Sequence, residues 1–141
     1  MGSILAIDYG LKRIGLAVSD PGRVFAFPCG VIENKDINYV ISEIKKVISG
    51  KEIDLMIVGM PYNMDKSKSE MAKNVENFIK IIKEKLGLEV RAVDERLSSF
   101  TAEENLRDSN ISSKKMKKYI DSEAARVILE EFLSIGIKSD L

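Results

Sequence analysis

The N-terminal third of the chain contains three runs of strand-forming residues joined by very short connections. They cover residues 3–9, 13–19 and 24–33, and Gly10 and Asp20-Pro21-Gly22 supply turn signals between them. Connections this short join antiparallel neighbours, because a parallel pair needs a crossover of a dozen or more residues. The sequence therefore predicts an antiparallel three-stranded unit at the start of the chain.

Beyond the third strand, helical and strand patterns alternate. The apolar spacing predicts helices at residues 36–49 and 67–86 and strands at residues 55–58 and 88–93, with Gly87 ending the second helix. A strand, helix and strand in this order form a parallel, right-handed βαβ unit. Both strands of such a unit end at the same edge of the sheet, where binding sites commonly form.

The C-terminal part predicts a short helix near residues 101–108 and a final helix that begins at residue 114 or 121 and ends at residue 134. By helical spacing, one face of the final helix carries Asp121, Ala125, Ile128 and Phe132. All these elements together predict an α/β fold. Its mixed five-stranded sheet has three antiparallel strands followed by the parallel βαβ unit, and helices flank it.

Length and charge limit the classes of function. A chain of 141 residues fits one domain, residues 1–141, with no room for two large domains around a cleft. The 22 basic and 22 acidic side chains cancel, so overall charge predicts no polyanionic partner. Local basic clusters at Lys12-Arg13, Lys66, Lys68 and Lys114–Lys118 are still sufficient for phosphate binding.

Cysteine use and hydropathy predict a cytoplasmic protein that does not enter membranes. Cys29 is the one cysteine, so an internal disulfide is impossible. The sequence has no signal-peptide pattern and no apolar run of about 18 residues.

Three acidic residues, Asp8, Glu95 and Asp121, each close or continue an apolar run. Burying a carboxylate costs several kcal/mol unless a cation or hydrogen bonds compensate it. Each acid has an ordinary explanation: Asp8 can bond to its turn or to Arg13, Glu95 can pair with Arg96, and Asp121 can cap a helix. Together they can converge at one place in an open α/β sheet.

Such convergence suits a hard metal ion. The chain has no His and a single Cys, which disfavours zinc, whereas carboxylate oxygens suit Mg²⁺ or Mn²⁺. Two such cations about 3.5 to 4 Å apart, held by shared carboxylates, activate a water and stabilise the leaving oxygen of a phosphodiester. The acids therefore suggest metal-dependent phosphodiester hydrolysis.

Four ordered segments resemble the signature blocks of the YqgF family of Holliday-junction-resolvase-like nucleases. They are Asp8–Asp20, Val58–Asp65, Asp94–Ser99 and Asp121–Ala125, and the resemblance extends over essentially the whole chain. It implies an RNase H-like fold, a cytoplasmic location and trimming of the 5′ end of the 16S ribosomal RNA precursor. Resolution of branched DNA is the alternative activity.

Carried over by position, the family's catalytic and metal-binding acids are Asp8, Glu95 and Asp121. We predict a site that forms loosely and is completed by metal and nucleic acid, because Asp8 and Glu95 would lie two strands apart, about 9.6 Å. The basic and amide residues near these acids are candidate nucleic-acid ligands, although a solvated turn or face explains them equally well. They are Lys12, Arg13, Asn63, Lys114, Lys117 and Lys118.

Two other functions remain open at this point. One is a non-catalytic module that binds structured RNA or branched DNA. The other is a nucleotide-binding domain, because Asp8, Gly10 and Gly15 also match the first phosphate loop of actin and sugar-kinase domains. The sequence allows a monomer or a homodimer, and junction resolution would favour the dimer because two symmetric cuts need two sites.

Overall fold

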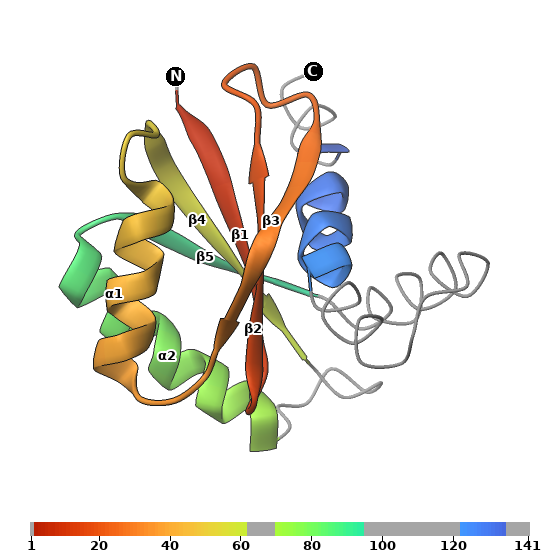
Figure 1. Ribbon diagram of the computed structural model, residues 1–141. Helices are drawn as coiled ribbons and strands as arrows, with labels where there is room; N and C mark the ends of the chain where they lie inside the picture. The colour runs from red at the N-terminus through yellow and green to blue at the C-terminus, as the bar shows by residue number, and fades with distance from the viewer. Residues whose placement is uncertain (1, 62–69, 95–121, 135–141) are drawn as a thin grey trace, which may run out of the picture.

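The computed structural model describes residues 2–61, 70–94 and 122–134. In chain order the elements are β1 (Ser3–Tyr9), β2 (Arg13–Ser19), β3 (Ala26–Glu33), α1 (Ile37–Ile48), β4 (Ile53–Met60), α2 (Glu70–Leu86) and β5 (Glu89–Asp94), followed by a helix over 122–134 (Figure 1). The short helix predicted near residues 101–108 lies outside the described residues. No helix in the described part of the chain is long and apolar enough to cross a membrane.

The five strands form one sheet in the order β3-β2-β1-β4-β5. β1 pairs antiparallel with β2, and β2 pairs antiparallel with β3, whereas β4 is parallel to both β1 and β5. This confirms the predicted mixed sheet. The first strand of the chain is therefore the central strand, and a residue near its end lies between the two parts of the sheet.

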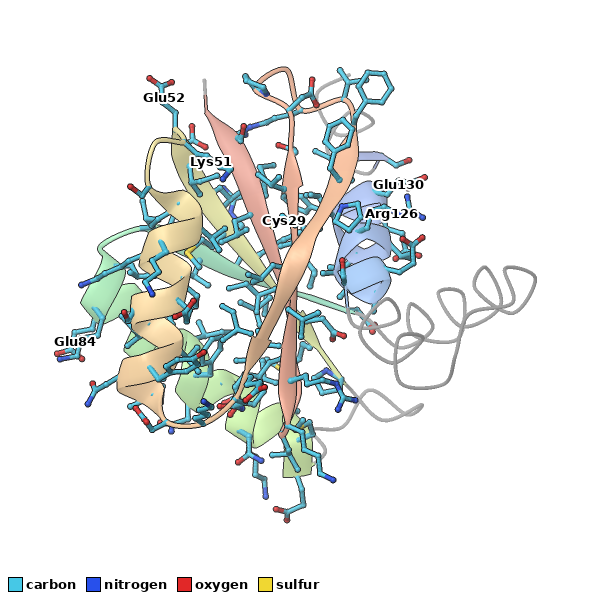
Figure 2. All side chains as sticks on the ribbon, viewed as in Figure 1. Cys29, Lys51, Glu52, Glu84, Arg126 and Glu130 are labelled. Atoms are coloured by element: carbon cyan, nitrogen blue, oxygen red, sulfur yellow. The ribbon has the colours of Figure 1, made fainter. Side chains whose placement is uncertain are left out.

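Strand alternation divides the core into two layers. Leu5 and Ile7 of β1 pack on the face covered by α1 and α2, while Ile4 and Ala6 pack on the face covered by the 122–134 helix (Figure 1). On the solvent side of that helix, Arg126 forms ion pairs with glutamates one turn away on either side (Figure 2). The predicted arrangement of helices on the sheet is confirmed on both faces.

The third strand begins two residues later than predicted, at Ala26 instead of residue 24. The cause is the Asp20 carboxylate, whose Oδ1 accepts hydrogen bonds from the backbone N–H groups of Val24 at 2.8 Å and Phe25 at 2.7 Å. These two N–H groups therefore bond to the aspartate of the turn and not to a neighbouring strand, as is common for aspartate in turns.

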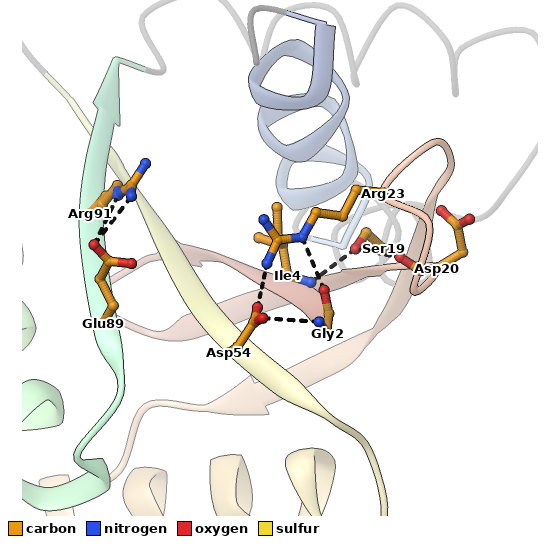
Figure 3. A network of polar contacts seen from close by, with 8 residues as sticks. All are labelled: Gly2, Ile4, Ser19, Asp20, Arg23, Asp54, Glu89 and Arg91. Carbon is orange, nitrogen blue, oxygen red and sulfur yellow. Dashed lines mark hydrogen bonds and ion pairs between the residues drawn. The ribbon is translucent and has the colours of Figure 1, made fainter. Parts of the chain in front are cut away.

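Polar contacts fix the end of the sheet at which β1 begins (Figure 3). The Gly2 N–H donates to Asp54 Oδ2 at 2.9 Å, and Arg23 Nε donates to the Gly2 carbonyl oxygen at 2.9 Å. Arg23 also forms an ion pair with Asp54. Deeper in the sheet, the buried N–H of Ile4 donates to Ser19 Oγ at 2.9 Å. The β2–β3 connection is thereby tied to the first residues of β1 and β4.

We expect the Asp54 contribution to stability to disappear in acid. The Gly2 N–H bond and then the Arg23 charge lower the pKa of Asp54. A carboxyl whose pKa is lower in the folded state adds stability above its unfolded pKa of about 3.9, and this is lost as pH falls through the folded value. Urea unfolding should show Asp54→Asn to be less stable than wild type at pH 7, with the two converging below about pH 4. A difference independent of pH would contradict this explanation.

Candidate metal and nucleic-acid site

Asp8 is the next-to-last residue of β1 and is half-buried. Side chains alternate along a strand, so Asp8 shares a face with Ile4 and Ala6. That face packs against the 122–134 helix through the apolar cluster that contains Ile4 and Ala6. The carboxylate therefore follows two core residues on the same sheet face, as the sequence predicted.

The residue paired with Asp8 on β2 is a glycine, Gly15. On β4 the register pairs Ile7 with Val58, and Gly59 is the next residue along β4. A glycine inside a strand commonly marks a position where a ligand or another backbone approaches closely. Gly15 therefore fits a ligand that contacts the Asp8 carboxylate.

The turn after Asp8 is held by Asn34. Its side-chain Nδ2 donates to the Gly10 carbonyl oxygen at 2.8 Å, and its backbone N–H donates to the Lys12 carbonyl oxygen at 2.9 Å. A Cβ atom on Gly10 would lie 2.4 Å from the Arg13 carbonyl oxygen, so any other residue there would displace the backbone of the turn. Sequence reasoning missed the role of Asn34, whose only signal is an amide directly after a strand.

The same turn brings two cationic residues next to Asp8. Arg13 is half-buried and lies on the Asp8 face, because its neighbour Ile14 packs on the other face. Since Asp8 pairs with Gly15, Arg13 is its diagonal neighbour, within reach of a long side chain. Lys12 is exposed at the tip of the turn. The structure thus places both predicted cations at the end of β1 that carries the carboxylate.

The remaining predicted site residues, Glu95, Asp121, Asn63, Lys114, Lys117 and Lys118, lie outside the described residues. Two described residues close in sequence to Glu95 and Asp121 lie on the sheet face that carries Asp8. Val93, near the end of β5, packs against the apolar cluster that includes Ala125 of the C-terminal helix. Within residues 2–61, 70–94 and 122–134, no group of three or more His, Cys, Asp or Glu residues could hold a metal ion.

Cys29 packs on the sheet face covered by α1 and α2, which is the face opposite Asp8. Burial raises the pKa of its thiol to about 11, so the sulfur stays protonated at neutral pH (Figure 2). With no His in the chain, oxygen ligands are the available donors, and they favour Mg²⁺ or Mn²⁺ over softer metals. The one described member of the predicted acid set, Asp8, fits such a cation by its chemistry and by its pairing with Gly15.

The sequence matches known proteins over almost its whole length. A family model described as RuvX, Holliday junction resolvase, matches residues 2–135. A protein of Maridesulfovibrio salexigens named as a candidate pre-16S rRNA nuclease is 37% identical over 131 residues, which are 93% of this chain and 97% of that protein. A protein of Desulforamulus reducens with the same name is 38% identical over 135 residues, 96% of this chain and 98% of that protein.

Among solved structures, the RuvC protein of Thermus thermophilus in complex with a Holliday junction substrate superimposes with a TM-score of 0.60. The match covers 97% of this chain and 96% of RuvC at 14% identity. A second Thermus thermophilus RuvC structure matches with a TM-score of 0.56 at 12% identity. At these identities the likeness concerns the fold, which is RNase H-like, as predicted. Sequence and fold together show that the chain belongs to the RuvX (YqgF) family of Holliday-junction-resolvase-like proteins.

Proposed function

We propose that this protein is a metal-dependent nuclease that cleaves phosphodiesters of structured RNA, with the 5′ end of the 16S ribosomal RNA precursor as its substrate. The observation that carries the proposal is the position of Asp8, a half-buried carboxylate paired with Gly15 near the end of the central strand. Relatives of 37% and 38% identity that are named for this activity support the choice of substrate. Residues 1–141 act as one cytoplasmic domain.

In this proposal Asp8, Glu95 and Asp121 hold Mg²⁺ or Mn²⁺. The bound cations would activate the attacking water and stabilise the leaving oxygen. Asp8 contributes a carboxylate from a rigid central strand, which limits the reorganisation needed when substrate arrives. The site is completed when nucleic acid binds, so tight metal binding by the protein alone would argue against this part of the proposal.

The protein's own cations position the substrate. Lys12 and Arg13 stand at the end of β1, where they would contact phosphates next to the bond that is cleaved. We extend this backbone-binding role to Asn63, Lys114, Lys117 and Lys118. Such contacts fix the register of a nucleic acid without reading its sequence, so affinity should fall steeply with salt.

Resolution of branched DNA is the second candidate function, and the description of the matching family favours it. The two functions differ in the assembly they need. Two symmetric cuts at a junction require two sites, and hence a homodimer, whereas trimming of one RNA end requires only a monomer.

The test is cleavage of a labelled 16S precursor fragment and of a four-way DNA junction in Mg²⁺, Mn²⁺ or EDTA. We expect cleavage of the RNA in either metal and none in EDTA, with slower cleavage of the junction. Faster cleavage of the junction would favour the resolvase. Binding of both substrates without cleavage would favour a non-catalytic module, and stabilisation by ATP in a thermal-shift assay would favour a nucleotide-binding domain.

A further inference from the structure

A small cleft of about 220 Å³ lies on the other face of the sheet from Asp8, between residues from the end of β1, the start of α1 and α2. Its lining includes Tyr9 and three amides, Asn34, Asn74 and Asn77. Pockets for drug-sized ligands measure about 300 to 1,000 Å³. This cleft is smaller and suits a single planar ring system.

One wall of the cleft is aromatic. Tyr9 is half-buried, and its ring lies 4.6 Å from that of Phe78, centre to centre, with 39° between the ring planes. Phe78 is buried in the core and also lines the cleft, so the two rings form one aromatic wall. A half-buried ring held in this way can stack on a flat ligand with little loss of side-chain entropy.

The other walls are amides with unused hydrogen-bonding capacity. Asn74 and Asn77 are exposed and stand three residues apart on α2, so they lie on one side of the helix. Neither side chain is hydrogen-bonded within the described part of the chain. Asn34 is fixed by its bond to the Gly10 carbonyl oxygen. Each amide offers both a donor and an acceptor, which the edge of a heterocyclic base also presents.

The charges at the cleft favour a neutral ligand. Lys35 and Asp36 both line it, and their charges cancel. Asp36 Oδ1 caps α1 by accepting the Tyr39 N–H at 2.9 Å, and the Lys35 ammonium lies 5.0 Å from the centre of the Tyr39 ring. The Asp36 carboxylate would repel an anionic group, whereas it would not repel an uncharged base.

From this geometry we propose that the cleft binds one unpaired nucleobase, with adenine preferred, because paired amide donors and acceptors match the adenine edge. Asp8 and Tyr9 are consecutive residues, with Cα atoms about 3.8 Å apart and side chains on opposite faces. A single strand crossing this edge of the sheet places a phosphate at Asp8 and a neighbouring base at Tyr9. The role of this base beside the cleaved bond rests on the proposed nuclease function, but base binding itself does not.

The test is binding in EDTA, where no metal-dependent cleavage occurs, measured by fluorescence anisotropy. The two probes are a labelled oligoadenylate and an abasic oligomer of the same length. We expect wild type to bind the oligoadenylate about tenfold more tightly than the abasic oligomer. The double variant Asn74→Ala, Asn77→Ala should keep only about a threefold difference, because it loses the amide contacts and retains the stacking on Tyr9. The matched control is Asn38→Ala, an exposed asparagine on α1 outside this cleft, which should keep the wild-type difference.

Retention of the tenfold difference by the double variant would overturn the proposal, and so would an equal loss of affinity for both probes, since that indicates backbone contacts. The result also separates the two proposals. If wild type cleaves RNA while the variant keeps its discrimination, the base pocket is wrong and the nuclease stands. If no cleavage is found but the variant loses most of its discrimination, the pocket stands and the nuclease is wrong.

Discussion

Replacing Asp8 by Asn should reduce the rate of metal-dependent cleavage by about a thousandfold or more. Loss of one metal-binding carboxylate removes several kcal/mol of transition-state stabilisation, and each factor of ten corresponds to about 1.4 kcal/mol. Asn has nearly the same shape, and in the metal-free protein it relieves repulsion between carboxylates, so the fold should persist with similar or higher stability. Single-turnover cleavage and thermal unfolding of the same samples measure both effects.

The matched control is Asp54→Asn. Asp54 lies near the start of β4, at the opposite end of the sheet from Asp8, and it is held by Gly2 and Arg23. Its replacement should lower stability at neutral pH and leave the cleavage rate within about twofold of wild type. Wild-type cleavage by the Asp8→Asn variant would remove Asp8 from the mechanism.

Replacing Gly10 by Ala should reduce cleavage by about a hundredfold, because a displacement of about 1 Å next to a reacting group can have that effect. The new Cβ would lie 2.4 Å from the Arg13 carbonyl oxygen, which is backbone and must shift. The turn carrying Lys12 and Arg13 would move with it. Overpacking of this kind costs about 1 to 3 kcal/mol of stability, so the variant should fold with a lower melting temperature.

The control for this variant is Gly22→Ala in the β2–β3 turn. There the added Cβ would approach the end of the Asp20 side chain at 3.1 Å, and a side chain can adjust more easily than a backbone atom. We expect little change in cleavage. If Gly10→Ala cleaved as fast as wild type at a temperature where both are folded, the turn would not position the substrate.

The sequence was sufficient to predict the strands, their pairing and the face on which Asp8 lies, because these follow from local periodicity and from connection length. Local patterns could not predict that Asp8 follows the residue paired with Val58, since this depends on the register between β1 and β4, about fifty residues apart. The predicted start of β3 was wrong by two residues because the Asp20 side chain accepts the N–H groups of the turn that would otherwise pair with a strand.

The structure also bears on the ordinary explanation of Asp8, that it stabilises its own turn. Asn34 supplies two hydrogen bonds to that turn, at Gly10 and Lys12. Asn34 lies 24 positions from Gly10 in the sequence, and the pairing of β2 with β3 brings the two together. Sequence periodicity does not show such a contact. Asn34 therefore holds this turn through groups other than the Asp8 carboxylate.

The most direct test of the central claim is Mn²⁺ binding, measured by the loss of the free Mn²⁺ electron paramagnetic resonance signal in the presence of nucleic acid. Wild type and Asp54→Asn should bind Mn²⁺ equally. Each of Asp8→Asn, Glu95→Gln and Asp121→Asn should bind Mn²⁺ at least about tenfold more weakly. Replacing a residue that only supports a metal ligand typically lowers metal affinity about 10- to 100-fold, and loss of a ligand itself should lower it further. Undiminished Mn²⁺ binding by Asp8→Asn would contradict a metal site at the end of β1.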